Sequence, residues 1–111
     1  MNTTNFNTLY SQLKTGVETV AKNSLHDYEQ QAKQDGETAL TTMKTNLQHW
    51  TAEVENGSMT GSDLSFLLQG DESLSEMVAL KEAGLSEVRI DQFRNGLINM
   101  VVSTLTGFIK V

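Results

Sequence analysis

The sequence of 111 residues contains no cysteine and no proline. Without cysteine, the chain can form neither a disulfide framework nor a thiolate nucleophile nor a thiolate site for zinc or an iron–sulfur cluster. Without proline, the usual helix breaker is missing, and glycine is the only strong signal for the end of a helix. The chain is instead rich in leucine, glutamate, glutamine, lysine and methionine, which favour helices. This composition predicts an all-α protein, and the length fits a single helical domain over residues 1–111.

Positive charge is also scarce, since eight Lys and Arg face 14 Asp and Glu, for a formal net charge of −6. Nucleic-acid binding needs a basic patch that neutralises phosphates, so we expect no nucleic-acid partner. Residues 1–20 lack the cationic start and the apolar core of a secretory signal, which predicts a cytoplasmic location. The uncharged segment from Asn95 to Ile109 is too short and too polar for a membrane span, which takes about 20 apolar residues.

Apolar residues recur every three or four positions between residues 25 and 54, which is the repeat of one helix face. A straight helix of this length measures about 45 Å, whereas a compact chain of this size has a radius of gyration of about 13 Å. We therefore expect an elongated fold. Gly36 lies on the stripe and suggests the close approach of another helix. The stripe consists of Leu25, Tyr28, Ala32, Gly36, Leu40, Met43, Leu47, Trp50 and Val54.

A similar stripe over residues 6–21 continues into this one without loss of phase. One interpretation is a single helix over residues 5–55. The other is two helices broken near residue 23, where Ser24 and Asp27 resemble a capping box. Because unbroken phase would be accidental if the chain turned back, we expect a long N-terminal arm with at most a kink at this point.

After this arm the run Glu55–Gly61 contains Asn-Gly and a second glycine, which predicts a reversal of the chain. Two short helices follow: one opens at Ser62 and ends at Gly70, and the other opens with a capping box at Ser73 and ends at Gly84. The last helix runs from Glu87 to Phe108. The predicted fold is an elongated all-α hairpin or bundle, in which two short helices and a long C-terminal helix pack against the N-terminal arm.

The C-terminal helix is the most apolar element, and its apolar face is broad enough to touch two neighbours at once. We expect one flank to pack on the arm and the other to meet a partner. A second copy of the chain is the most economical partner, because two-fold dimers are the commonest oligomers. We therefore predict a homodimer or higher homo-oligomer, with another helical protein as a further possible partner. The predicted interaction residues are Phe93, Leu97, Val101, Leu105, Phe108 and Ile109.

No pattern in the sequence predicts a catalytic, cofactor or metal site. His26 and His49 are the only histidines, and on one helix they would lie about 35 Å apart. The Glu-x-x-His pattern of di-iron bundles is absent. The run Gly57–Gly61 is the only glycine-flanked group of hydroxyls, and it lacks the lysine of a phosphate loop. We therefore expect a protein that is not an enzyme and needs no cofactor.

Two functions remain. The first is a non-enzymatic structural or protein-interaction module that acts by helix–helix association with itself or with a helical partner. The alternative is peripheral binding to a membrane or lipid surface through the amphipathic C-terminal helix. The polar face of that helix carries only Arg94 and Lys110, whereas membrane-surface helices carry several cations. The charge pattern therefore favours the interaction module.

Overall fold

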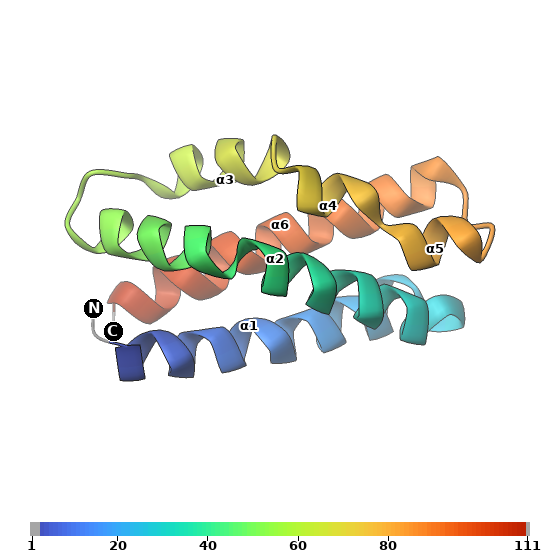
Figure 1. Cartoon of the computed structure of the whole chain (residues 1–111), viewed down its shortest axis with the longest axis horizontal. Coiled ribbons are helices and arrows are strands. Elements are labelled where there is room, and N and C mark those ends of the chain that lie inside the picture. The colour runs from blue at the N-terminus through green and yellow to red at the C-terminus, as the bar shows by residue number, and fades with distance from the viewer. Residues whose placement is uncertain (1–2, 111) are drawn as a thin grey trace.

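The computed structural model describes the backbone of residues 3–110 and the side chains of residues 5–109, and this part of the chain contains helices and no strand. Three long helices each form one side of a four-sided bundle: α1 (Thr3–Ser24), α2 (Glu29–Glu55) and α6 (Glu87–Lys110). The fourth side consists of three short helices in succession: α3 (Gly61–Gln69), α4 (Glu72–Glu76) and α5 (Val78–Glu82) (Figure 1). The prediction of an all-α bundle with a long N-terminal helix against a long C-terminal helix is confirmed.

The expected continuity of the N-terminal arm is wrong. Helix α1 ends at Ser24, a single 3₁₀ turn η1 (His26–Tyr28) follows, and α2 runs back along α1 (Figure 1). A Cβ atom built on Gly36 would lie 2.5 Å from Cγ1 of Val17, so the two helices touch where the sequence suggested a close approach. The turn at η1 therefore makes α1 and α2 an antiparallel pair.

The overall dimensions follow from this turn. A continuous helix over residues 5–55 would be about 75 Å long, but the molecule measures 42 × 23 × 20 Å. Its radius of gyration is 13.6 Å, close to the value of about 13 Å for a compact chain of this size. The bundle is about twice as long as it is wide, and it lacks the greater elongation that an unbroken arm would give.

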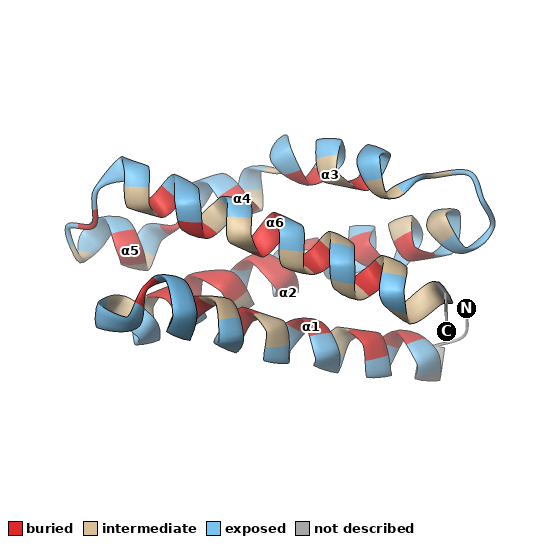
Figure 2. Cartoon of the chain, turned by 180° about the vertical axis from the view of Figure 1, so that it is seen from behind, coloured by how far each residue is buried: buried red, intermediate tan, exposed pale blue. Residues whose placement is uncertain are grey.

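One core runs the length of the bundle and receives side chains from all four sides (Figure 2). The buried residues of α1 are Phe6, Leu9, Leu13, Val17 and Ala21. Phe93 of α6 is the largest fully buried side chain. Each buried leucine or phenylalanine contributes about 1.5 to 3 kcal/mol to folding. The members that are less than 2 % exposed include Leu9, Leu13, Leu25, Met43, Leu47, Leu64, Leu68, Leu80, Phe93 and Leu105.

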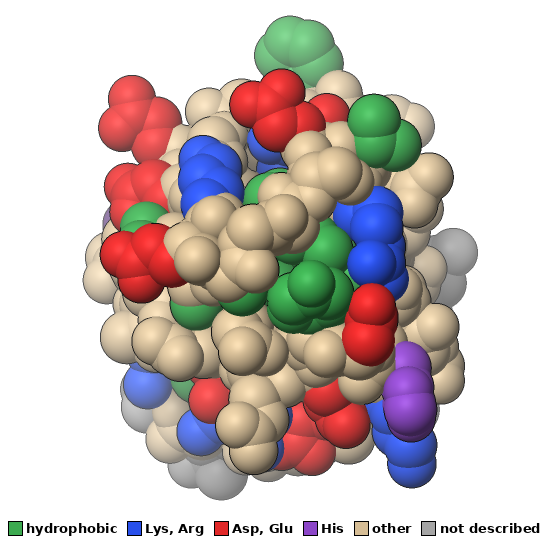
Figure 3. Space-filling model, turned by 90° about the vertical axis from the view of Figure 1, so that its right-hand side faces the viewer, with side chains coloured by type: hydrophobic (Ala, Val, Ile, Leu, Met, Phe, Trp, Pro, Cys, Tyr) green, Lys and Arg blue, Asp and Glu red, His purple; other side chains and the backbone are tan. Residues whose placement is uncertain are grey.

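A salt bridge joins the α1–α2 turn to the first turns of α6. The Arg89 guanidinium donates to both carboxylate oxygens of Asp27, at 2.8 and 3.2 Å, and lies over the ring of Tyr28. These hydrogen bonds hold the pKa of Asp27 below its usual value and raise the pKa of Arg89. The capping box expected from Ser24 and Asp27 does not form, because Asp27 pairs with Arg89 instead. Figure 3 looks onto this end, where charges of both signs surround a hydrophobic patch.

The predicted reversal after α2 is confirmed, but the cap of α3 lies earlier than expected. The Thr60 hydroxyl accepts from the backbone N–H of Asp63, and the Asp63 carboxylate accepts from the backbone N–H of Thr60. This capping box precedes Ser62, which we expected to open the helix. Gly70 follows α3 at φ −91°, so it does not take the left-handed conformation expected of it.

The second short helix of the prediction is two helices. Asp71 caps α4 by accepting from the backbone N–H of Ser73, so the capping box expected at Ser73 does not form. Met77 then interrupts the helix at φ 40°, a left-handed conformation that is rare for residues other than glycine. Gly84 ends α5 at φ 86°, as its position in the sequence predicted.

The cap of α5 comes from a distant part of the chain. Met77 occupies the position before α5 and its side chain makes no capping hydrogen bond. Instead, the Asp35 carboxylate of α2 accepts from the backbone N–H groups of Ala79 and Leu80, at 2.9 and 2.8 Å. A carboxylate at a helix N-terminus satisfies free donors and interacts favourably with the helix dipole. Asp35 therefore attaches the fourth side of the bundle to α2.

Candidate functional site

The six predicted interaction residues of α6 divide into two groups. Phe93, Leu97, Val101 and Leu105 are at most 2 % exposed and belong to the core. No partner can reach them while the bundle is folded, so they do not form a surface. Phe108 and Ile109 are half-buried and remain accessible at the end of α6. Most of the broad apolar face of α6 is buried within the chain, because α6 packs against α1, α2, α3 and α5.

The half-buried Phe108 borders a face formed by α1 and α6 together, which lies at the front in Figure 2. The two helices are close here: Val20 lies 3.2 Å from a Cβ atom built on Gly96, and a Cβ atom on Gly16 would collide with Sδ of Met100. We call this the α1–α6 face. Its residues are Asn5, Thr8, Gln12, Gly16 and Thr19 of α1, with Gly96, Met100, Ser103, Thr104, Gly107 and Phe108 of α6.

None of the residues that define the α1–α6 face is charged. The only acidic residue of α1 is Glu18, and every other acid of the chain lies between residues 27 and 91. Glu18 pairs with Lys33 of α2 at 3.2 Å, and this hydrogen bond raises the pKa of Lys33. Glu18 therefore points to the α1–α2 side. On a chain with a net charge of −6, the α1–α6 face is an uncharged surface.

A hollow of about 620 Å³ lies within this face, between the first turns of α1 and the last turns of α6. Gly107 lines it, and a Cβ atom built on this glycine would meet nothing within 4 Å. The aromatic ring of Phe108 and the hydroxyls of Ser103 and Thr104 lie beside the glycine. The hollow therefore combines an apolar ring with groups that both donate and accept hydrogen bonds. It is lined by Asn5, Gln12, Ser103, Thr104, Gly107 and Phe108.

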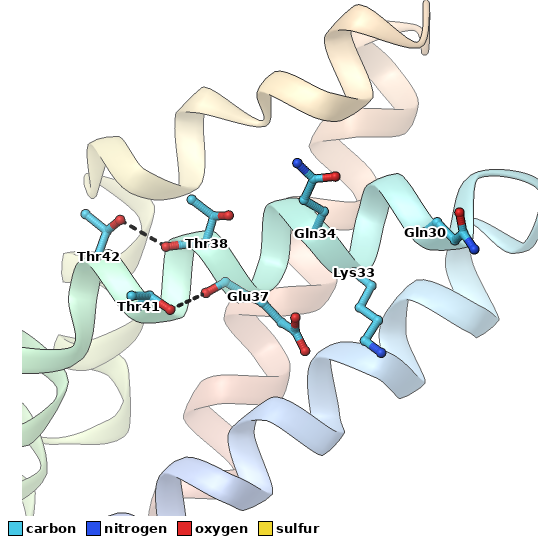
Figure 4. A pocket seen from close by; sticks show the side chains of 7 residues that line it. All are labelled: Gln30, Lys33, Gln34, Glu37, Thr38, Thr41 and Thr42. Atoms are coloured by element: carbon cyan, nitrogen blue, oxygen red, sulfur yellow. Dashed lines mark hydrogen bonds between the residues drawn. The ribbon is translucent and has the colours of Figure 1, made fainter.

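Two further hollows lie along α2. One of about 430 Å³ follows the outside of α2, and all seven of its lining residues come from this helix (Figure 4). Thr41 and Thr42 donate to backbone carbonyls one turn earlier, those of Glu37 and Thr38, so their hydroxyl protons are already used. A second, of about 180 Å³, lies between α2 and the α4–α5 segment around the Asp35 cap.

Four large apolar side chains are exposed away from the α1–α6 face: Phe66, Leu67, Val78 and Val88. Phe66 is the most exposed at 76 %. Its neighbours one helical turn away, Ser62, Asp63 and Gln69, are polar and exposed. Isolated apolar residues of this kind are common on soluble proteins and do not define a binding surface.

The two histidines are far apart in the bundle, as expected. His26 belongs to the η1 turn, and His49 lies near the other end of α2 beside a hollow lined by Phe6, Gln48 and Ala52. Within the described part of the chain, no group of three His, Cys, Asp or Glu side chains could hold a metal ion. None of the helices described over residues 3–110 has the length and the apolar character needed to cross a membrane.

Sequence reasoning missed the α1 half of the face. The signal was present, because Thr8, Gln12, Gly16 and Thr19 follow at helical spacing and carry no charge. Such a stripe is ambiguous in the sequence, since it describes a solvated face equally well. In the structure Met100 packs against Gly16, which shows that the uncharged stripe of α1 lies beside α6.

These features define a helical bundle in which α1 and α6 form a hollowed face whose defining residues carry no charge. No protein-family model, curated protein or solved structure matches the chain.

Proposed function

We propose that the protein is a non-enzymatic interaction module that binds a helical partner through the α1–α6 face. The observation that carries the proposal is the half-buried Phe108 beside the hollow of about 620 Å³, on a face without charge. Interface centres are depleted in charged residues and enriched in aromatic residues and methionine. Phe108 and Met100 supply both kinds of side chain on this face.

Small residues support contact with a helix in particular. Gly107 and Ser103 lie one turn apart on the exposed side of α6, and Gly107 has open space above it. Small side chains allow the backbones of two helices to approach closely. The uncharged hydroxyls and amides around them can form hydrogen bonds without the desolvation cost of a buried charge.

The burial pattern speaks against the alternative of a lipid-surface binder. Insertion into a lipid surface needs the apolar face of an amphipathic helix. On α6 that face is formed by residues such as Phe93, Leu97 and Val101, which are closed inside the bundle. Lipid binding would therefore require the bundle to open and give up this core.

The proposal is tested with a photo-cross-linking amino acid placed in the native cell. At Ser103, on the α1–α6 face, we expect a discrete cross-linked product after illumination. At Thr45, an exposed residue of α2 that lies off this face, we expect none. Products at both positions or at neither would contradict the proposal. Retention of the protein on anionic vesicles, measured by co-sedimentation, would support the lipid-surface alternative instead.

A further inference from the structure

We infer that residues 71–83, which contain α4 and α5, form a strap that opens as one unit while α1, α2, α3 and α6 stay folded, and that the Asp35 carboxylate is the latch that holds it closed. The strap lies between Gly70 and Gly84, and glycine changes its backbone angles at little cost. The inference concerns the α2 side of the bundle and does not depend on the α1–α6 face. Three features carry it: the supports of the fourth side, the hydrogen bonds of the strap and the backbone of Met77.

The fourth side of the bundle is divided at Gly70 between two supports. Helix α3 packs on α6, and a Cβ atom built on Gly61 at its start would lie 3.5 Å from Cγ2 of Thr106. Helices α4 and α5 pack mainly on α2 instead. Helix α1 packs on α2 and α6. The strap can therefore leave α2 without breaking the contacts of α3 with α6 or those of α1 with its two neighbours.

The hydrogen bonds of the strap are local except at Asp35. The ammonium group of Lys81 in α5 donates to the backbone carbonyl of Ser75 in α4 at 3.0 Å, which ties the two short helices together. Within the part of the chain that the structure describes, the hydrogen bonds from Ala79 and Leu80 to the Asp35 carboxylate are the only ones that join the strap to the three long helices. Loss of this one acceptor group therefore frees the whole strap from α2.

The contact between the strap and α2 is incomplete beside the latch. A hollow of about 180 Å³ separates the two, and polar side chains such as Thr38 of α2 and Glu76 of α4 line it. The hydrogen bond from Ala79 to Asp35 is only part-buried. The latch therefore lies at the border of a polar hollow, and continuous apolar packing does not enclose it.

The backbone of Met77 is strained while the strap is closed. Its φ of 40° lies in the left-handed region, which is unfavourable for a residue with a Cβ atom. Such a conformation persists only where the surrounding structure holds it, and it is common in segments that switch between two states. The burial of the Met77 side chain and the capped turn after it hold it here. Opening releases this strain, which favours the open form.

Opening exchanges one surface for another. The closed strap buries Leu74, Met77 and Leu80, and Ile90 of α6 lies beside it and is 4 % exposed. In the open form these apolar side chains become accessible together with the Asp35 carboxylate. The strap is therefore a switch for a surface on α2 and α6 that the closed bundle hides.

The absence of cysteine allows opening to be measured at single thiols. Leu80→Cys places a thiol under the strap and Leu13→Cys places one in the α1 core, and both leucines are 0 % exposed. With a small thiol reagent in excess, we expect Leu80→Cys to react at least about tenfold faster, because only Leu13→Cys requires the whole bundle to unfold. Equal rates would overturn the inference.

A second substitution identifies the latch. In Leu80→Cys, we expect Asp35→Ala to raise the reaction rate about tenfold or more. The control Leu9→Val weakens the α1 core, so it should accelerate Leu13→Cys and leave Leu80→Cys unchanged. If Leu9→Val accelerates Leu80→Cys as much as Asp35→Ala does, the thiol reacts only through global unfolding and the inference fails. No acceleration by Asp35→Ala would show that Asp35 is not the latch.

Hydrogen exchange of the unmodified chain gives a measurement that is free of substitutions. As sub-denaturing urea rises, we expect the amides of Ala79, Leu80 and Lys81 to converge on one opening reaction. Its urea slope should be above zero and below that of the Leu13 amide, because the strap exposes less surface than global unfolding does. A slope of zero would mean that the amides open one by one, and a slope equal to that of Leu13 would mean that the strap and the bundle unfold together. Either result overturns the inference.

Discussion

The carboxylate of Asp35 accepts the backbone N–H of Leu80 at 2.8 Å, although the two residues are 45 positions apart. The same carboxylate accepts from Ala79 at 2.9 Å. Asp35 is 8 % exposed, and its hydrogen bond with Leu80 is buried while the one with Ala79 is part-buried. One side chain of α2 thus supplies the N-terminal cap that the sequence of α5 lacks.

Replacing Asp35 should weaken this attachment strongly. Hydrogen bonds to charged groups contribute about 1.5 to 3 kcal/mol each, and their loss leaves the buried N–H of Leu80 and the part-buried N–H of Ala79 without an acceptor. We expect Asp35→Ala to lower the free energy of unfolding by about 2 to 4 kcal/mol. Asp35→Asn keeps one acceptor oxygen and should lose less. Urea denaturation followed by circular dichroism gives both values.

The control for this prediction is Glu53→Ala, which removes an exposed carboxylate from the same helix. Surface substitutions usually change stability by no more than about 0.5 kcal/mol. Equal losses for the variants at positions 35 and 53 would show that Asp35 is not a cap.

The two glycines at the α1 contacts should respond differently to alanine. At Gly36 the new methyl group would lie 2.5 Å from Cγ1 of Val17, a branched side chain that is rigid in a helix. At Gly16 it would meet the thioether of Met100, which can move aside. We expect Gly36→Ala to destabilise by about 1 to 3 kcal/mol, as overpacking does. Thermal unfolding should place Gly16→Ala clearly above it in stability, and the reverse order would contradict the packing described.

The contribution of the Asp27–Arg89 pair should depend on pH. The unfolded Asp27 has a pKa of about 3.9, and the hydrogen bonds from Arg89 lower the folded pKa below this value. The stabilisation is therefore fully present above the unfolded pKa and is lost as the pH falls through the folded pKa. Both side chains are more than one-third exposed, so the effect is small and weakens with salt.

We expect the difference in melting temperature between the unmodified chain and Asp27→Asn to be constant above about pH 5 and to shrink below about pH 4. The raised pKa of Arg89 lies beyond the range of the experiment and adds no alkaline transition. A difference that persists unchanged to the lowest pH would show that it does not come from the charged Asp27–Arg89 pair.

The cap of α3 offers a matched pair of hydroxyls. Thr60→Ala removes the oxygen that accepts from Asp63, which should cost about 1 kcal/mol. Ser62→Ala removes a hydroxyl two residues later that makes no cap, and it should be neutral within about 0.5 kcal/mol. Chemical denaturation of the two variants ranks them, and a larger loss at position 62 would place the cap where the sequence alone suggested it.

The sequence was sufficient to predict the all-helical class, the reversal after α2 and the end of α5 at Gly84. These features depend on local signals, namely periodicity and turn glycines. The reversal at η1 was not predictable from periodicity. The phase of the apolar stripe determines which side of a helix is buried. It does not determine whether the next helix continues in the same direction or runs back. Leu25 is 1 % exposed within the turn itself, so the stripe passes through the reversal without a gap.

The break between α4 and α5 was invisible for a different reason. Met77 takes a left-handed conformation that local preference assigns to glycine, at a cost of about 1 to 2 kcal/mol. Its side chain is 2 % exposed, and burying a methionine contributes about 1.5 to 3 kcal/mol. Packing therefore offsets the backbone strain, and the distant cap from Asp35 holds the next turn. Neither contribution can be read from the residues near Met77.

Four of the six predicted interaction residues, Phe93, Leu97, Val101 and Leu105, lie in the core instead of on a surface. Apolar periodicity marks burial, and it does not distinguish burial by the same chain from burial by a partner. Phe93 to Leu105 are buried because three other sides of the bundle meet α6. The α1–α6 face needs coordinates, because it combines polar residues from two helices that are distant in sequence.

The division of one side into three short helices has a consequence for how the protein is degraded. A helix of five residues, such as α4 or α5, has almost no internal hydrogen bonds of its own and depends on its neighbours. Segments of this kind open locally long before the whole molecule unfolds. A protease added to the native protein should therefore cut first near Gly70 and Met77, and leave the α1–α2 pair intact until later.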